Sequence, residues 1–74
     1  MIANQLAAWR ARHGRRGISK AHLARQLKVS RSYIVKLESG HSQPSAVMMF
    51  RVAHYFGCRI EDVFSFVPDE VEAS

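Results

Sequence analysis

Two predicted helices in the middle of the chain are separated by only two residues, and this spacing limits the fold more than any other feature. Ser19 is a favourable N-cap for a helix over residues 20–27. Ser30 is a favourable N-cap for a second helix, which ends before Gly40 because glycine readily adopts a left-handed conformation. The connection Lys28-Val29 allows only a tight turn. Two short helices joined in this way most often form a nearly perpendicular helix-turn-helix unit, whose second helix projects from the domain.

The second of these helices combines a narrow apolar stripe with an unusual outer face. Ile34 and Leu37 have the spacing that turns both side chains toward a core. The helix offers its other side chains outward, and Tyr33 and Val35 are poorly suited to a surface that meets only water. We therefore expect the outer face to bind a partner, and its residues are Arg31, Ser32, Tyr33, Val35 and Lys36.

The flanking sequence predicts three further helices and one strand. Residues 3–12 have high helix propensity, and the basic segment HGRRG then interrupts the helix. A longer helix starts at Pro44-Ser45 and stops at Gly57, and a short one covers residues 59–64. An alternating apolar pattern over residues 64–67 indicates a strand. We predict an all-α domain of five helices over residues 1–67 with a short C-terminal β-strand, a core that includes Trp9, Met49, Phe50 and Phe56, and a loose acidic tail over residues 68–74.

The charges are segregated along the chain. Residues 1–37 contain nine lysines and arginines and no acid, whereas residues 60–74 contain five acids and no lysine or arginine. A basic surface of this kind is typical of proteins that bind a polyanion. The chain shows no signal peptide and no apolar run of the roughly 20 residues that a membrane span needs, so we expect a soluble cytoplasmic protein without a membrane partner.

The segment ISKAHLARQLKVSRSYIVKLESGHSQPS, continuing into FRVAHYFGCRIEDVF, resembles the Cro/lambdoid-repressor (Xre) family of helix-turn-helix DNA-binding proteins. The resemblance covers residues 6–64 with its markers in register. The short length and the ending IEDVFSF are most similar to the small stand-alone dimeric repressors of the cytolysin-repressor type. The resemblance implies a five-helix lambda-repressor-like domain that binds double-stranded DNA, associates with the nucleoid and represses transcription as a homodimer on a palindromic operator.

The resemblance also implies roles for individual residues. Arg31, Ser32 and Lys36 match base-reading positions, and Val35 on the same face could contact a thymine methyl group. Arg10 and Glu38 match positions that form a structural ion pair. The expected phosphate-binding residues are Ser19 and Lys20 before and at the start of one helix, Tyr33, the group Ser39, His41, Ser42 and Gln43 after the recognition helix, and Arg15 and Arg16 in the loop before Ser19.

Three features depart from the family pattern. Lys28 occupies a turn position that usually carries glycine, and a left-handed lysine costs roughly 1 kcal/mol. Lys20 replaces the usual glutamine, although a lysine can still bind a phosphate as a point charge. The loop that contains Arg15-Arg16-Gly17 is longer than usual.

Other functional classes receive weaker support from the sequence. The four histidines have no cooperating metal-ligand spacing, no catalytic combination is visible, and we expect neither an enzyme nor a metal, cofactor or small-molecule ligand. Three apolar residues near the C-terminus need a cover that a second subunit would supply, and they are Phe64, Phe66 and Val67. The competing functions are an antitoxin of a toxin–antitoxin module and a protein-interaction module that has lost DNA binding.

Overall fold

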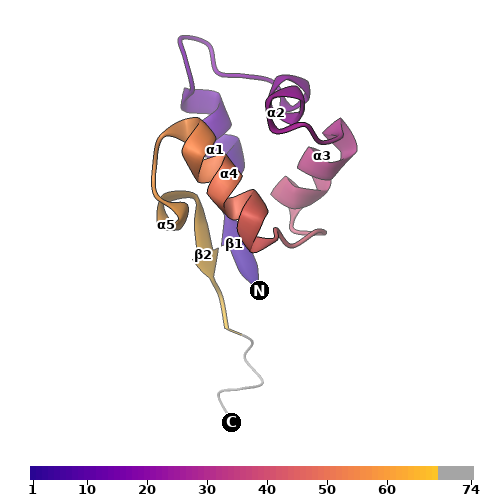
Figure 1. The fold of residues 1–74 in the computed structure, drawn as a ribbon, viewed down its shortest axis with the longest axis vertical. Coiled ribbons are helices and arrows are strands. Elements are labelled where there is room, and N and C mark those ends of the chain that lie inside the picture. The colour runs from indigo at the N-terminus through magenta and orange to yellow at the C-terminus, as the bar shows by residue number, and fades with distance from the viewer. Residues whose placement is uncertain (69–74) are drawn as a thin grey trace.

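The computed structural model describes residues 1–68, and in them five helices lie between two short strands (Figure 1). The all-α fold with a C-terminal strand is therefore confirmed. The loose tail was predicted over residues 68–74, and all of it except Pro68 lies outside the described residues. The elements are β1 (Ile2–Asn4), α1 (Leu6–Arg12), α2 (Lys20–Leu27), α3 (Arg31–Ser39), α4 (Ala46–Phe56), α5 (Ile60–Val63) and β2 (Phe64–Phe66).

The two strands bring the ends of the described chain together. They are antiparallel, and Ile2 lies opposite Phe66 while Asn4 lies opposite Phe64. The prediction of a helix from residue 3 was wrong, because α1 begins only at Leu6. Pairing with β2 overrides the local helix propensity, and the side-chain oxygen of Asn4 accepts a hydrogen bond of 3.1 Å from the Leu6 N–H at the start of the helix.

One hydrophobic core joins all five helices and β2. Its largest fully buried side chains include Leu23 from α2 and both Ile34 and Leu37 from α3, as the apolar stripe of α3 predicts. The expected core position of Phe50 was wrong, since 66% of this side chain is exposed. The buried core consists of Leu6, Leu23, Ala24, Leu27, Ile34, Leu37, Met48, Val52, Val63 and Phe64.

The helices of the described part are all short. None of the helices within residues 1–68 is long and apolar enough to cross a membrane. In Figure 1, α3 lies at one side of the molecule and α5 at the opposite side, with α4 between them. The outer face of α3 is consequently free of cover from the rest of the fold.

Candidate nucleic-acid interface

The turn between α2 and α3 has the tight geometry that the sequence predicts. Lys28 adopts a left-handed conformation with φ of 58°, and it is the one non-glycine residue with positive φ among residues 1–68. The N–H of Lys28 donates to the carbonyl of Arg25, and the N–H of Val29 donates to the carbonyl of Ala24 at 2.9 Å. These bonds satisfy carbonyls at the end of α2 and fix the direction in which α3 leaves.

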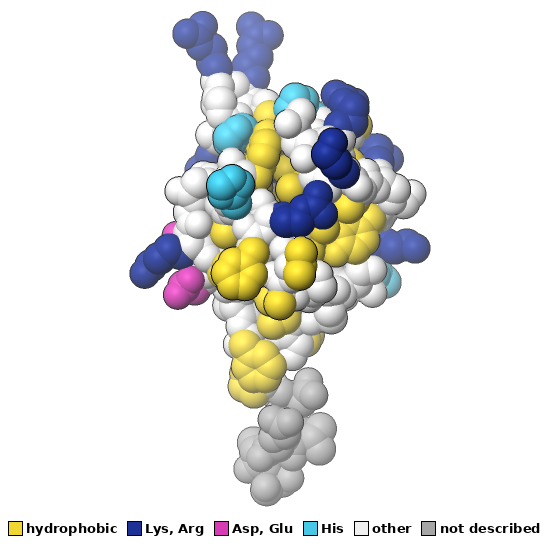
Figure 2. Space-filling model, viewed as in Figure 1, with side chains coloured by type: hydrophobic (Ala, Val, Ile, Leu, Met, Phe, Trp, Pro, Cys, Tyr) yellow, Lys and Arg dark blue, Asp and Glu magenta, His cyan; other side chains and the backbone are white. Residues whose placement is uncertain are grey.

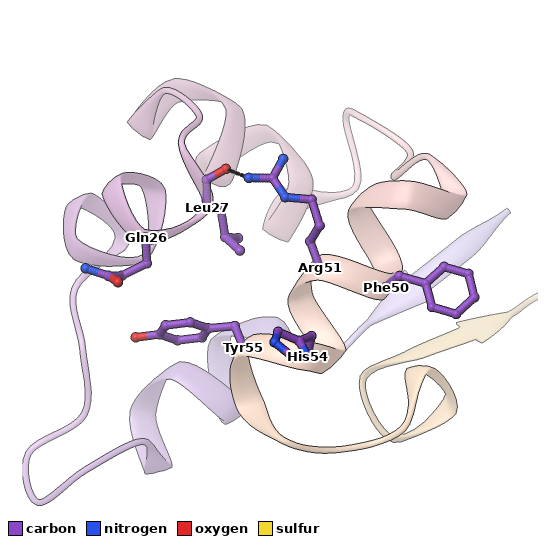
Figure 3. A pocket seen from close by; sticks show the side chains of 6 residues that line it. All are labelled: Gln26, Leu27, Phe50, Arg51, His54 and Tyr55. Carbon is purple, nitrogen blue, oxygen red and sulfur yellow. Dashed lines mark hydrogen bonds between the residues drawn. The ribbon is translucent and has the colours of Figure 1, made fainter.

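A side chain from α4 supports the same turn, and the sequence pattern did not reveal it. The guanidinium of Arg51 donates a hydrogen bond to the carbonyl oxygen of Leu27, the last residue of α2 (Figure 3). Arg51 thereby satisfies a carbonyl that the helix itself leaves unpaired. It lies beside a hollow of about 370 Å³ between α2 and α4, lined by Gln26, Leu27, Phe50, Arg51, His54 and Tyr55.

Helix α3 begins and ends at the capping residues expected for it. The Ser30 side chain accepts a hydrogen bond of 3.0 Å from the N–H of Tyr33, and Gly40 takes a left-handed conformation with φ of 85°. With Ile34 and Leu37 buried, the side chains of Arg31, Ser32 and Lys36 are exposed, and Val35 is half-buried.

Tyr33 combines an outward position with a packing role. Its side chain is half-buried and contacts the edge of the hydrophobic core. The aromatic ring therefore contributes to holding the first turn of α3 against the domain.

Arg10 and Glu38 lie together as an ion pair that joins α1 to the end of α3. The Arg10 Nε donates to one Glu38 carboxylate oxygen at 2.8 Å, and Nη2 donates to the other at 3.1 Å. The remaining Nη1 donates to the carbonyl of Ile18 at 3.0 Å, just before α2. The side chains are only 17% and 10% exposed. This pair neutralises the one acid of α3 and links three parts of the helix-turn-helix region.

Asn4 provides a second support for α3 that the sequence pattern did not indicate. Its side-chain amide donates to the carbonyl of Leu37 at 2.9 Å, near the C-terminal end of the helix. Asn4 lay inside the helix predicted over residues 3–12, and no local signal indicated its contact with α3.

The segment after α3 is held by its own hydrogen bonds. The N–H groups of His41 and Ser42 both donate to the carbonyl of Lys36, and the Ser39 hydroxyl donates to the same carbonyl at 3.1 Å. The Ser39 hydroxyl also contacts Nδ1 of His41 at 2.7 Å. Since these groups are engaged, the exposed side chain of His41 offers its other ring nitrogen, Nε2, to a ligand.

Gln43 lies in the expected loop but has a different environment from its neighbours. Its side-chain oxygen accepts from the N–H of Ile2 at 2.5 Å, and its side-chain amide donates to the carbonyl of Ile2. Gln43 thus ties the loop after α3 to the outer edge of β1. The expected phosphate contact of Gln43 would have to break or share these bonds.

The N-terminus of α2 and the loop before it carry further basic residues. Ser19 caps the helix by accepting from the N–H of His22 at 3.0 Å, and no acid occurs in the first turn. Lys20 is half-buried at the first helical position, whereas Arg15 and Arg16 are exposed in the loop. A helix N-terminus with a lysine and without acids favours a negatively charged partner.

Few of the basic side chains are neutralised by acids. Within residues 1–68 the ion pairs are Arg10 with Glu38 and Arg59 with Asp62. Asp62 and its neighbour Glu61 both lie on α5. In the view of Figure 2, acidic side chains are visible only at that side of the molecule. Within residues 1–68 the positive charge on α2, α3 and their connecting loops is thus mostly not neutralised by acidic side chains.

The possible reactive and metal-binding side chains of the described residues include the free thiol of Cys58. Burial first, and the charge of Asp62 second, raise the pKa of the Cys58 thiol, so the unreactive protonated form is favoured at neutral pH. Residues 1–68 contain no group of three or more histidine, cysteine, aspartate or glutamate side chains placed to hold a metal ion.

The C-terminal apolar residues differ from one another in exposure. The expectation that Phe64 needs a cover from outside was wrong, because its side chain is only 4% exposed in the core of its own chain. Phe66 is 68% exposed and Val67 is 44% exposed. The strand alternation directs Phe64 inward and Ser65 outward, while Phe66 lies at the rim of the sheet beside Ile2.

Comparison with known proteins identifies the relatives of this chain. The family described as Helix-turn-helix matches residues 6–63. An uncharacterized HTH-type transcriptional regulator from Methanocaldococcus jannaschii is 39% identical over 69 residues, which cover 93% of this chain and 100% of the relative. An uncharacterized HTH-type transcriptional regulator from Archaeoglobus fulgidus is 34% identical over 70 residues, covering 95% of this chain and 96% of that protein. A second such regulator from the same organism is 35% identical over 54 residues, covering 73% and 76% respectively.

Proposed function

This chain belongs to the helix-turn-helix family, and from that premise we propose that it is a DNA-binding transcriptional regulator that inserts α3 into the major groove. The observation that carries the proposal is the outer face of α3. Its exposed cations Arg31 and Lys36 lie on a helix whose apolar stripe is buried and whose single acid is neutralised by Arg10. An α-helix of this kind fits the major groove, where base edges present distinct donors and acceptors.

Four residues of α3 are proposed to read bases. Arg31, at the start of the helix, reaches deepest and can donate two hydrogen bonds to guanine O6 and N7, worth about 1–3 kcal/mol of discrimination. Ser32 can bond to several bases, and Lys36 lies one turn further along the same face and also favours guanine. Val35 is half-buried and can contact a thymine methyl group.

The phosphate contacts are proposed to surround this face. Ser19 and Lys20 bind one backbone at the N-terminus of α2, and the side chains of His41 and Ser42 bind beyond the end of α3. Ser39 joins them only by giving up the hydrogen bond that its hydroxyl donates to the carbonyl of Lys36. Arg15 and Arg16 add attraction to the backbone near α2. The half-buried ring of Tyr33 supports α3, and its hydroxyl is available for a phosphate. Gln43 is the weakest member of the group because its amide already bonds to Ile2.

We propose that the regulator acts as a homodimeric repressor on a palindromic site. Exposed Phe66 and Val67 at the end of the two-stranded sheet form an apolar surface that a symmetric partner can cover. A dimer places two recognition helices about one helical turn apart along the duplex. Sedimentation analysis of wild type and Phe66→Ser tests this point. A wild-type dimer that the substitution converts to monomer supports the proposal, whereas a monomeric wild type at micromolar concentration contradicts it.

DNA binding itself is tested by fluorescence anisotropy with duplex from upstream of the protein's own gene and a scrambled duplex, across a salt series. We expect sequence-dependent binding that weakens steeply with salt because bound cations displace counterions. Arg31→Ala should reduce the preference for the specific duplex. Lys20→Ala should weaken binding to both duplexes equally and lower the salt slope by about 1.

A matched control for these substitutions is Arg59→Ala. Arg59 is an exposed arginine beside α5, on the side of the molecule opposite α3 (Figure 1). Its removal takes away the same charge and should leave both affinity and preference nearly unchanged. Absence of binding to any duplex at low salt would contradict the proposed function and favour a protein-interaction module.

A further inference from the structure

The loop between α1 and α2 projects from the end of the molecule (Figure 1), and its tip, the turn over residues 14–16, contains Arg15 and Arg16. Lys and Arg side chains extend into solvent there in Figure 2. Arg15 and Arg16 are exposed and take part in no ion pair or side-chain hydrogen bond among the described residues. Their side chains therefore contribute nothing visible to the packing of the domain.

The base of this loop is held rigidly even though its tip is exposed. The N–H of Ile18 donates to the carbonyl of Arg10 at 3.0 Å, and the Arg10 side chain donates back to the carbonyl of Ile18. Arg10 also holds Glu38 at the end of α3. At Gly17, with φ of +76°, an added Cβ would lie 2.8 Å from the carbonyl oxygen of Ala11, so the chain passes too closely for any other residue. The base of the loop is consequently fixed relative to the recognition helix.

The position of the loop on bound DNA follows from the geometry of the helix-turn-helix unit. When the recognition helix lies in the major groove, the preceding helix crosses the sugar–phosphate backbone. That backbone is the wall between the major groove and the next minor groove. The N-terminus of α2 meets this wall, and Arg15 and Arg16 precede Ser19 by only a few residues. In the proposed complex, a loop that extends from this point past the backbone would reach the minor groove that flanks the site.

We infer that Arg15 and Arg16 enter the minor groove flanking each half-site and confer a preference for A·T-rich flanks; this inference rests on the proposed function. A narrow minor groove, as in A-tracts, concentrates negative potential and attracts arginine. Arginine suits this environment better than lysine because its guanidinium is more weakly hydrated and loses less hydration free energy on entering a narrow groove. Both residues at the tip are arginines, and no acid lies near them in residues 1–37 to oppose the approach.

The inference is tested with the full chain and three duplexes that share one core. The core is a sequence selected from random DNA, and its flanks are A-tracts, alternating G·C pairs or mixed sequence. Wild type, Arg15→Ala/Arg16→Ala and the charge-preserving Arg15→Lys/Arg16→Lys are compared by fluorescence anisotropy, with a thermal melt of each variant to verify folding. Neither substituted side chain is buried, so the variants should fold as wild type does.

We expect wild type to bind the duplex with A-tract flanks several-fold more tightly than the one with G·C flanks. The alanine variant should lose this preference, and the lysine variant should lose most of it while retaining overall affinity. The alanine variant should still distinguish the selected core from a scrambled core, because α3 is unchanged. The slope of log affinity against log salt concentration should become shallower by about 2. Each removed arginine reduces the number of counterions released on binding by roughly 0.9.

Three outcomes would overturn the inference. Equal binding of wild type to all flanks would exclude readout of the flanking minor groove. An equal loss of affinity for all flanks in the alanine variant, with full rescue by lysine, would mean that the arginines contact phosphates alone. No change in the alanine variant would mean a solvated loop. In each case selective binding to the core would still support the proposed function, whereas loss of core selectivity in wild type would refute that function itself.

Discussion

Replacement of Arg10 by methionine is expected to be among the most destabilising changes near the recognition helix. The substitution removes both hydrogen bonds to the Glu38 carboxylate and the bond to the Ile18 carbonyl, while retaining much of the apolar side-chain volume. It also leaves the Glu38 carboxylate, with only 10% side-chain exposure, without its cation. Removing one member of a buried ion pair costs about 3–5 kcal/mol.

The exposure of the pair places the expected cost near the lower end of that range. Because 17% of Arg10 remains exposed, water can replace part of the lost interaction, and we expect about 3 kcal/mol. The whole domain should have about 4–11 kcal/mol of stability. The variant should therefore melt about 12–24 °C below wild type. Urea and thermal unfolding at equal protein concentration, followed by circular dichroism, measure both quantities.

Two comparison variants separate the ion pair from a general effect of losing an arginine. Arg12→Met removes an exposed arginine of the same helix, whose guanidinium lies 5.0 Å from the Trp9 ring centroid, and should cost no more than about 1 kcal/mol. Arg10→Met/Glu38→Leu leaves no unpaired charge and should be more stable than Arg10→Met alone. The reasoning is refuted if Arg10→Met costs no more than Arg12→Met, or if the double variant is the less stable one.

Three further predictions concern backbone geometry, the turn and pH. Gly17→Ala should destabilise the protein clearly more than Gly14→Ala in urea unfolding, because both glycines have positive φ but only Gly17 has a backbone oxygen 2.8 Å from the added Cβ. Arg51→Met should lower the free energy of unfolding by about 1.5–3 kcal/mol in the same assay, because it removes the charged hydrogen bond to the Leu27 carbonyl. A variant as stable as wild type would contradict a stabilising role of this contact. The hydrogen bond from the Arg59 N–H lowers the pKa of the Asp62 carboxyl below its usual value of 3.8. Wild type should therefore be more stable than Asp62→Asn above pH 3.8, and this advantage should vanish as the pH falls through the lowered pKa. An NMR titration midpoint for Asp62 at or above 3.8 would contradict this.

The helix-turn-helix region was predictable because its signals are local. Ser30 and Gly40 delimit α3, and two apolar residues at helical spacing define the face it buries. The ion pair between Arg10 and Glu38 could not follow from spacing, since 28 residues separate them, and the expectation came from the family resemblance.

The less predictable features all depend on contacts between distant parts of the chain. Ala3 and Asn4 lie in a segment that favours a helix locally, but they pair with a strand 60 or more residues away. Arg51 bonds to a backbone carbonyl at the end of α2 and Asn4 to one in α3, and no side-chain pattern gives a signal for such contacts. Phe50 has a helical spacing compatible with burial, yet the orientation of α4 leaves it on the outer face.

The central claim is that the outer face of α3 reads a specific DNA sequence, and selection from a pool of random duplexes tests it most directly. Wild type should select a palindromic motif whose half-sites lie about one helical turn apart. Arg31→Ala should select a motif that has lost the preference at one base pair of each half-site and keeps the others. Failure of wild type to enrich any motif, or an identical motif from Arg31→Ala, would contradict the claim.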